Sequence, residues 1–211
     1  MNLSSVALSL DLISKELDDI RNRREIVLKG SRDVISLSSK SIVAMHTENK
    51  PLARALLKDA RRKLVRLRKE ARQDLTKYLV SPETEYVEAE VLFSIITKRR
   101  IPGFRSLSVN EASYILGLLD AIGEIKRLIL DSIRVGKTDE ASDLFSIAEG
   151  LYIMISPFAS FDKIAGGTRR KLDVARVLVE NSRAVVTEDR RRRDLIIAMQ
   201  NLSIGLSSNQ S

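Results

Sequence analysis

The sequence lacks cysteine and tryptophan, has a single histidine, and contains few residues that interrupt helices. Without Cys the chain forms no disulfide, no zinc–thiolate site and no thiol nucleophile. The lone His46 has no second His with which to build a zinc site. Only four Pro and nine Gly occur in 211 residues, and aromatic residues make up 4%. Since helix interiors exclude Pro and Gly and strands favour aromatics, this composition predicts an all-α protein.

Long apolar segments are also missing from the sequence. No early apolar run resembles a signal peptide, and no segment approaches the roughly 18 apolar residues needed to span a membrane. We therefore expect a cytoplasmic protein with no membrane partner. Hydrophobic residues make up 44% of the chain, which is enough for a core. The length predicts a single domain over residues 1–211, with a frayed tail at residues 203–211, which are rich in Ser and Asn.

Apolar residues recur at intervals of three and four along most of the chain, as on the buried face of a helix. Together with the positions of Pro, Gly and capping residues, they predict a bundle of about seven helices with a very long first helix. The expected helices span about residues 6–48, 51–79, 81–98, 108–135, 139–155, 164–186 and 188–202. Such long striped helices bury more surface against copies of themselves than one small bundle can hide, so we expect oligomerisation.

The charge balance favours a polyanionic partner. The chain carries 36 Lys and Arg against 28 Asp and Glu, a net charge of +8, although a surface rich in ion pairs would explain the same composition. We expect RNA contacts from the two densest groups of cations, Arg61, Arg62, Lys63, Arg66 and Arg68, and Lys98, Arg99 and Arg100. For each of them a solvated or ion-paired side chain is an equal alternative. Only Tyr86 and Phe104 lie near enough to stack on bases, which favours binding to the backbone.

Two pairs of acidic residues share helix faces. Glu85 and Glu88 are three residues apart in the third expected helix, and Asp139 and Asp143 are four apart at the start of the fifth. Carboxylate pairs on two helices are a common metal site in helical bundles, and carboxylates with Mg²⁺ suffice for phosphodiester hydrolysis. The alternative is that these acids only stabilise helix N-termini. The spacing alone favours that alternative.

Several stretches of the sequence resemble the translin family. Residues 24–33 are similar to the signature of the family's first helix, and residues 114–124 and 170–181 to two later helices. The stretch Glu85-Tyr86-Val87-Glu88-Ala89 resembles the motif of translin-associated factor X, the catalytic branch of the family. These matches occur in the family's order over most of the chain. The closest resemblance is to that branch, in a form of archaeal type.

The resemblance implies an all-α fold, a closed hollow homo-oligomer (an octamer in the family) and Mg²⁺-dependent endonucleolytic cleavage of single-stranded RNA. It implies that Glu85, Glu88 and Asp139 are catalytic, and that these three and Asp143 bind the metal. Residue 143 is Glu in the family, so Glu149 and Glu124 are alternative ligands, although Glu124 would also suit an ion pair with a neighbour such as Arg127. A non-catalytic protein that binds single-stranded RNA or DNA, as translin does, is the alternative function. A helical scaffold with no role in RNA binding is another.

Overall fold

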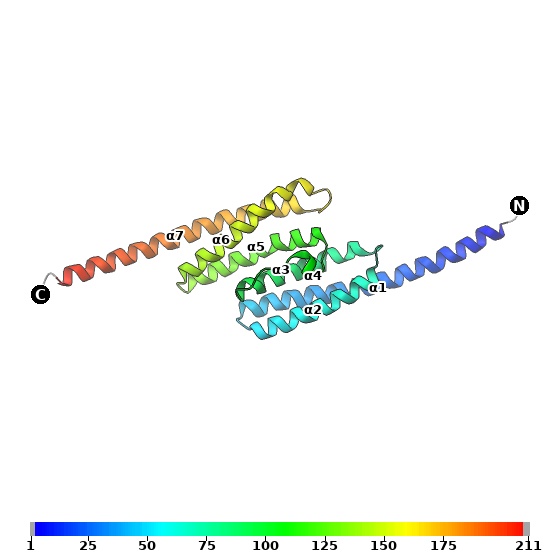
Figure 1. Ribbon diagram of the computed structural model, residues 1–211, viewed down its shortest axis with the longest axis horizontal. Helices are drawn as coiled ribbons and strands as arrows, with labels where there is room; N and C mark the ends of the chain where they lie inside the picture. Colours follow the sequence, from blue (N-terminus) through cyan, green and yellow to red (C-terminus); the bar gives the residue numbers. More distant parts are fainter. Residues whose placement is uncertain (1–2, 209–211) are drawn as a thin grey trace. The chain divides into compact units, whose positions relative to one another are not determined.

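The computed structural model describes residues 3–208, with side chains to residue 204, and every regular element in this part is helical (Figure 1). In chain order the elements are α1 (Ser4–His46), α2 (Lys50–Ala71), η1 (Thr76–Leu79), α3 (Val80–Ile96), α4 (Phe104–Leu107), α5 (Glu111–Arg134), α6 (Thr138–Ile155), η2 (Ser156–Phe161) and α7 (Thr168–Ser208), where η marks 3₁₀ helices. The prediction of an all-α fold with seven helices and a very long first helix is confirmed.

Two of the predicted helix boundaries are wrong. The helix expected over residues 51–79 ends at Ala71, because Arg72 adopts a left-handed backbone conformation with φ of 46°. The helices expected over residues 164–186 and 188–202 form one continuous helix, α7. No Pro or Gly separates them, so nothing in the local chemistry ends the first before the second begins. Glu188 and Asp189, acidic residues of a kind favoured in a first helical turn, lie inside α7.

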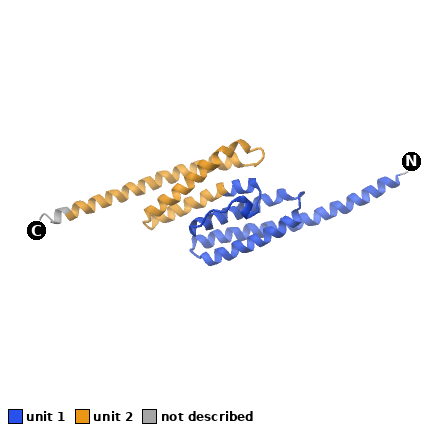
Figure 2. Cartoon of the chain, viewed as in Figure 1, with its two compact units in different colours: residues 1–117 blue, residues 118–211 orange. Residues whose placement is uncertain are grey.

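The chain divides into two compact units, residues 1–117 and residues 118–211 (Figure 2). The boundary falls inside α5, directly after Gly117. The single domain over residues 1–211 stays a prediction. Of the tail expected to be frayed, residues 203–208 continue α7, and residues 209–211 lie outside the described part of the chain.

In the first unit, α1 packs along α2 and α3, and α2 contacts α3. The buried face of α1 carries small residues that allow close packing, among them Val27, Val34 and Ser38. The start of α5 also lies against α3. A Cβ atom at Gly117 would stand 2.6 Å from the carbonyl oxygen of Thr84 and 2.6 Å from the Cβ of Val87. Only glycine therefore permits this approach of the two helices.

A buried carboxylate ties α2, α3 and the residue before α5 together. The side chain of Glu83 is 4% exposed and lies in the first turn of α3. One of its oxygens accepts a hydrogen bond from Arg68 Nε at 2.9 Å. The other accepts from the backbone N–H and the side-chain Nδ2 of Asn110, at 3.1 and 2.9 Å. Three donors from two other segments thus satisfy one buried acid, which makes its burial affordable only while all three stay in place.

In the second unit, α6 packs on α7, and η2 contacts both helices. Lys171 of α7 forms an ion pair with Asp120 of α5, and Arg183 of α7 forms another with Glu149 of α6. These pairs connect α7 to its neighbours at two points along its length.

Both long helices leave apolar residues exposed. In Figure 1 the N-terminal part of α1 extends past α2 and α3, and the C-terminal part of α7 extends past α6. The exposed apolar residues here are Leu3, which directly precedes α1, and Val6, Leu10, Ile13 and Leu17 of α1. Their alternating spacing of three and four is that of a coiled-coil seam. These segments are suited to packing against another helix.

The segment Thr138–Phe161 is long and apolar enough to cross a membrane by length and composition. The expectation that no segment is long and apolar enough to span a membrane is therefore wrong. A single helix of this kind is weak support for a membrane protein, because the core helices of soluble proteins pass the same test.

Candidate nucleic-acid interface

Three cations of α2 lie on one side of the helix. Arg54, Lys58 and Arg61 are four and three residues apart, which is the spacing of neighbours on a helix surface. The buried stripe of α2, which includes Ala53 and Leu64, packs into the first unit. The cations therefore project from the edge of the packed face.

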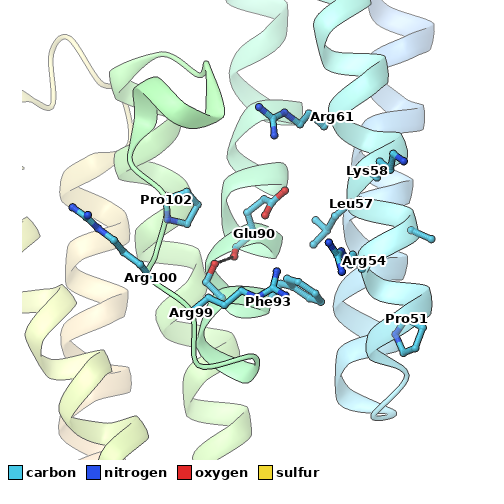
Figure 3. A pocket seen from close by; sticks show the side chains of 12 residues that line it. Pro51, Arg54, Leu57, Lys58, Arg61, Glu90, Phe93, Arg99, Arg100 and Pro102 are labelled. Atoms are coloured by element: carbon cyan, nitrogen blue, oxygen red, sulfur yellow. Dashed lines mark hydrogen bonds between the residues drawn. The ribbon is translucent and has the colours of Figure 1, made fainter.

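These three cations line an open cleft of about 690 Å³ together with Arg99 and Arg100, which follow α3 (Figure 3). The rest of the lining consists of Pro51, Ala55, Leu57, Glu90, Phe93, Ser94 and Pro102. All of these residues belong to the first unit. Five cations and one acid give the cleft a strongly positive lining, and a concave arrangement concentrates that field.

The loop after α3 is held in place by hydrogen bonds at both ends. The backbone N–H of Arg99 donates to the carbonyl of Ser94 at 2.8 Å, and the Arg99 guanidinium lies 6.0 Å from the centre of the Phe93 ring. At the other end, the Tyr114 hydroxyl donates to the carbonyl of Pro102 at 3.1 Å. The loop cations of the cleft therefore stand on an anchored backbone.

The acid of the cleft, Glu90, is positioned by a buried tyrosine. Tyr86 lies one turn earlier on α3, has no exposed surface, and donates from its hydroxyl to Glu90 Oε1 at 2.7 Å. Burial, followed by the charge of Glu90, raises the pKa of Tyr86 far above its ordinary value, so the hydroxyl keeps its proton and remains a donor. In Figure 3 the Glu90 side chain extends from α3 into the space toward α2.

The cations expected to bind RNA fall into three groups. Those that line the cleft are Arg61, Arg99 and Arg100. Those that form ion pairs are Arg62 with Asp59, Lys63 with Asp33, and Arg68 with Glu83. Those that are exposed outside the cleft lining are Arg66 and Lys98. The ion-paired alternative thus describes three of the eight, and RNA contacts by all eight stay predictions.

Sequence reasoning missed Arg54, Lys58 and Glu90. It weighed the density of cations along the chain, whereas the spacing of Arg54, Lys58 and Arg61 on one helix face was the signal that could have found the cleft. The suggestion that Tyr86 is available for base stacking is wrong, because its ring is fully buried. Phe104 instead contacts an aromatic ring of the protein, Tyr114, at a centroid distance of 6.2 Å.

The first predicted acidic pair, Glu85 and Glu88, lies half-buried on α3. At about 100° per residue, Glu88 and Glu90 are separated by roughly 200° around the helix axis. The pair therefore faces away from the side of α3 that lines the cleft. Within residues 3–204, no group of three or more Asp, Glu, His or Cys residues is placed to hold a metal ion.

The second predicted acidic pair, Asp139 and Asp143, is exposed in the first two turns of α6. Arg193 of α7 donates from Nη1 to Asp139 Oδ1 at 2.6 Å. This hydrogen bond, with the positive charge of the guanidinium, lowers the pKa of Asp139 below its ordinary value. One of the alternative ligands, Glu149, is ion-paired with Arg183. A metal ion bound by Asp139 would therefore share this carboxylate with Arg193 or displace Arg193 from it.

Comparison with known proteins gives the fold a family context. No family model matches the chain. Two structures of AfC3PO, one of them a complex with duplex RNA, superpose with a TM-score of 0.80 at 27% and 28% identity, covering 88% of this chain and 98% of that one. The chain has the translin-like fold of the C3PO proteins. The structure of apo-NeC3PO superposes with a TM-score of 0.76 at 22% identity, over 85% of this chain and 96% of that one.

The chain is also similar in sequence to a protein of Methanocaldococcus jannaschii. An uncharacterized protein of Methanocaldococcus jannaschii is 29% identical over 187 residues, which cover 87% of this chain and 84% of that protein. The translin-like fold predicted from the resemblance is confirmed.

Proposed function

We propose that this protein binds RNA through the cationic cleft of its first unit. The observation that carries the proposal is that five Arg and Lys residues, from α2 and from the loop after α3, line one cleft. The structure of AfC3PO with duplex RNA supports it, because that protein shares the fold over nearly its whole length.

The cleft cations would hold the phosphates of a strand without reading its bases. Arg54, Lys58 and Arg61 follow one side of α2, so they can contact successive positions of a backbone. Arg99 and Arg100 would hold the strand from the opposite wall. Binding of this kind releases counterions and weakens steeply as salt is raised.

The finer proposal is that the protein is an endoribonuclease acting on single-stranded RNA, with Mg²⁺ as cofactor. Glu85 and Glu88 in the first unit, and Asp139 and Asp143 in the second, offer carboxylate oxygens, the ligands that Mg²⁺ prefers. When bound, Mg²⁺ would activate water and offset the charge that develops on the phosphate. Glu85 and Glu88 of α3 would bind the metal ion. Arg193 would orient Asp139, its hydrogen-bond partner.

One observation favours the alternative, a non-catalytic protein that binds single-stranded RNA or DNA. Asp139 is already engaged by Arg193. In that case the acidic pairs serve only the stability of their helices.

We further propose that the protein acts in the cytoplasm as a closed, hollow homo-oligomer, with an octamer as the expected size. The exposed apolar seam at the start of α1 and the exposed apolar residues at the end of α7 support assembly. Soluble proteins rarely expose large apolar patches unless another surface covers them.

The binding proposal is tested with a labelled single-stranded RNA at several salt concentrations. We expect the double variant Arg54→Gln/Lys58→Gln to bind at least tenfold more weakly than wild type, with a shallower dependence on salt because two phosphate contacts are gone. The matched control is Arg169→Gln/Arg170→Gln, which removes the same charge from exposed positions of α7. Equal loss in the two double variants would reduce the cleft to a general charge effect and reject it as the binding site.

The nuclease proposal is tested by cleavage of an end-labelled single-stranded RNA with Mg²⁺, with EDTA, and with Glu85→Ala/Glu88→Ala. We expect internal cuts by wild type in Mg²⁺ only, and none by the double variant. Binding without cleavage under all conditions would assign the protein to the non-catalytic class. Cleavage that persists in the double variant would move the active site away from α3.

A further inference from the structure

An acidic residue such as Glu90 is not expected in a cleft whose only role is to attract phosphate. It is the one acid among the lining residues, beside five cations. A carboxylate repels the phosphates that those cations attract, so its presence weakens simple electrostatic binding. Its position is also well defined, because its partner Tyr86 is fully buried and donates to it at 2.7 Å.

The carboxylate has hydrogen-bonding capacity left for a ligand. Two carboxylate oxygens provide about four lone-pair sites, and the Tyr86 hydroxyl uses one of them. A ligand group that meets Glu90 must therefore be a hydrogen-bond donor. Phosphate oxygens at neutral pH are acceptors, so this group has to come from the sugar or the base.

The positions of the cleft cations indicate which donor group of the sugar or the base would meet Glu90. Arg54, Lys58 and Arg61 would fix the backbone along α2, and Glu90 faces that helix from α3 (Figure 3). The group of a nucleotide that lies nearest to its phosphates and can donate a hydrogen bond is the 2′-hydroxyl of ribose. That hydroxyl is also the group by which proteins distinguish RNA from DNA.

We infer that Glu90 makes the cleft selective for RNA by accepting a hydrogen bond from a 2′-hydroxyl of the bound strand. With ribose, the hydrogen bond offsets the repulsion between the carboxylate and the phosphates. With deoxyribose, the repulsion is left uncompensated. This inference rests on the proposed function, since it requires that the cleft hold a nucleic-acid backbone.

The test compares three oligonucleotides of one sequence, oligo(U), oligo(dU) and 2′-fluoro oligo(U), by fluorescence anisotropy at fixed salt. A hydrogen bond to a charged group corresponds to about a tenfold or greater difference in affinity. We expect wild type to bind oligo(U) about tenfold more tightly than either analogue. The 2′-fluoro sugar keeps an RNA-like conformation but cannot donate, so it separates the hydroxyl from the sugar shape.

The variant Glu90→Gln keeps an acceptor for Tyr86 and removes the charge. We expect it to bind oligo(dU) more tightly than wild type does, and the preference for oligo(U) to fall to about twofold or threefold. Tyr86→Phe, which releases the carboxylate from its anchor, should lower the preference part of the way. The control Glu180→Gln removes one exposed acid from α7 and should keep the full preference.

Equal binding of the three oligonucleotides by wild type, or an unchanged preference in Glu90→Gln, would overturn the inference. These outcomes differ from failure of the proposed function. If Arg54→Gln/Lys58→Gln binds oligo(U) as wild type does, the cleft is not the RNA site. If that variant loses binding while Glu90→Gln keeps the wild-type preference, the cleft binds RNA and only the role of Glu90 is wrong.

Discussion

Replacement of Glu83 by Gln should strongly destabilise the first unit. The substitution keeps the size of the side chain but places an amide nitrogen where a carboxylate oxygen now accepts a hydrogen bond. Arg68 would then face a neutral partner, and one donor of Asn110 would lose its acceptor. Breaking a buried ion pair from one side costs about 3 to 5 kcal/mol. Because the Arg68 side chain is 21% exposed and keeps some access to water, we expect the lower end, about 3 kcal/mol.

The assay is urea unfolding at one fixed protein concentration, since assembly makes stability depend on concentration. For a chain of this length, a loss of about 3 kcal/mol corresponds to a fall of roughly 6 to 12 °C in melting temperature. The control Asp59→Asn removes the partner of Arg62 in an exposed ion pair, and should cost about 0.5 kcal/mol or less. The double variant Glu83→Gln/Arg68→Gln should be more stable than Glu83→Gln, because no unpaired charge remains. A loss below about 1 kcal/mol in Glu83→Gln would refute the reasoning.

Three further substitutions test other features of the fold. Gly117→Ala should lower the free energy of unfolding by about 1 to 3 kcal/mol in urea, because the new methyl group meets the backbone and Val87 of α3. Gly150→Ala should raise it by about 0.5 to 1 kcal/mol, since the site is open and alanine favours the helix. Arg23 lowers the pKa of Asp74, so their pairing stabilises the fold above the ordinary carboxyl pKa and is lost as the pH falls through the lowered value. Asp74→Asn should therefore melt below wild type at pH 7, and the gap should narrow as the pH falls below the ordinary carboxyl pKa and through the lowered pKa of Asp74.

Each of these predictions has a contradicting outcome. A Gly117→Ala variant as stable as wild type would mean that α3 and α5 can move apart at no cost. A less stable Gly150→Ala variant would mean that a neighbour covers this face of α6. A gap that stays constant from pH 7 to pH 2 would show that Asp74 acts through packing rather than charge.

The helical architecture could be predicted from the sequence because it depends on local chemistry. The spacing of apolar residues and the few Pro and Gly place α1, α3, α5 and α6 within a few residues of their observed bounds. The end of α2 could not be placed in the same way. Arg72 takes a conformation that few non-glycine residues adopt, and no Gly or Pro at this point of the sequence indicates the end of the helix.

The candidate site could be predicted less well, because it depends on contacts between segments. The density of cations identified Arg61 and the loop after α3. It could not show that Arg68, in the same run, is held by Glu83 fifteen residues later. The sequence also could not show that Glu90 lines the cleft while Glu88, only two residues earlier on α3, faces away from it.

The order in which Arg68, Glu83 and Asn110 occur along the chain has a consequence for synthesis on the ribosome. The guanidinium emerges first, the carboxylate second and the amide last. The nascent chain can therefore pair the acid with its cation as soon as α3 forms beside α2, before α5 exists. The acid would be enclosed with its charge already balanced, and Asn110 would complete the cluster when the start of α5 closes over it.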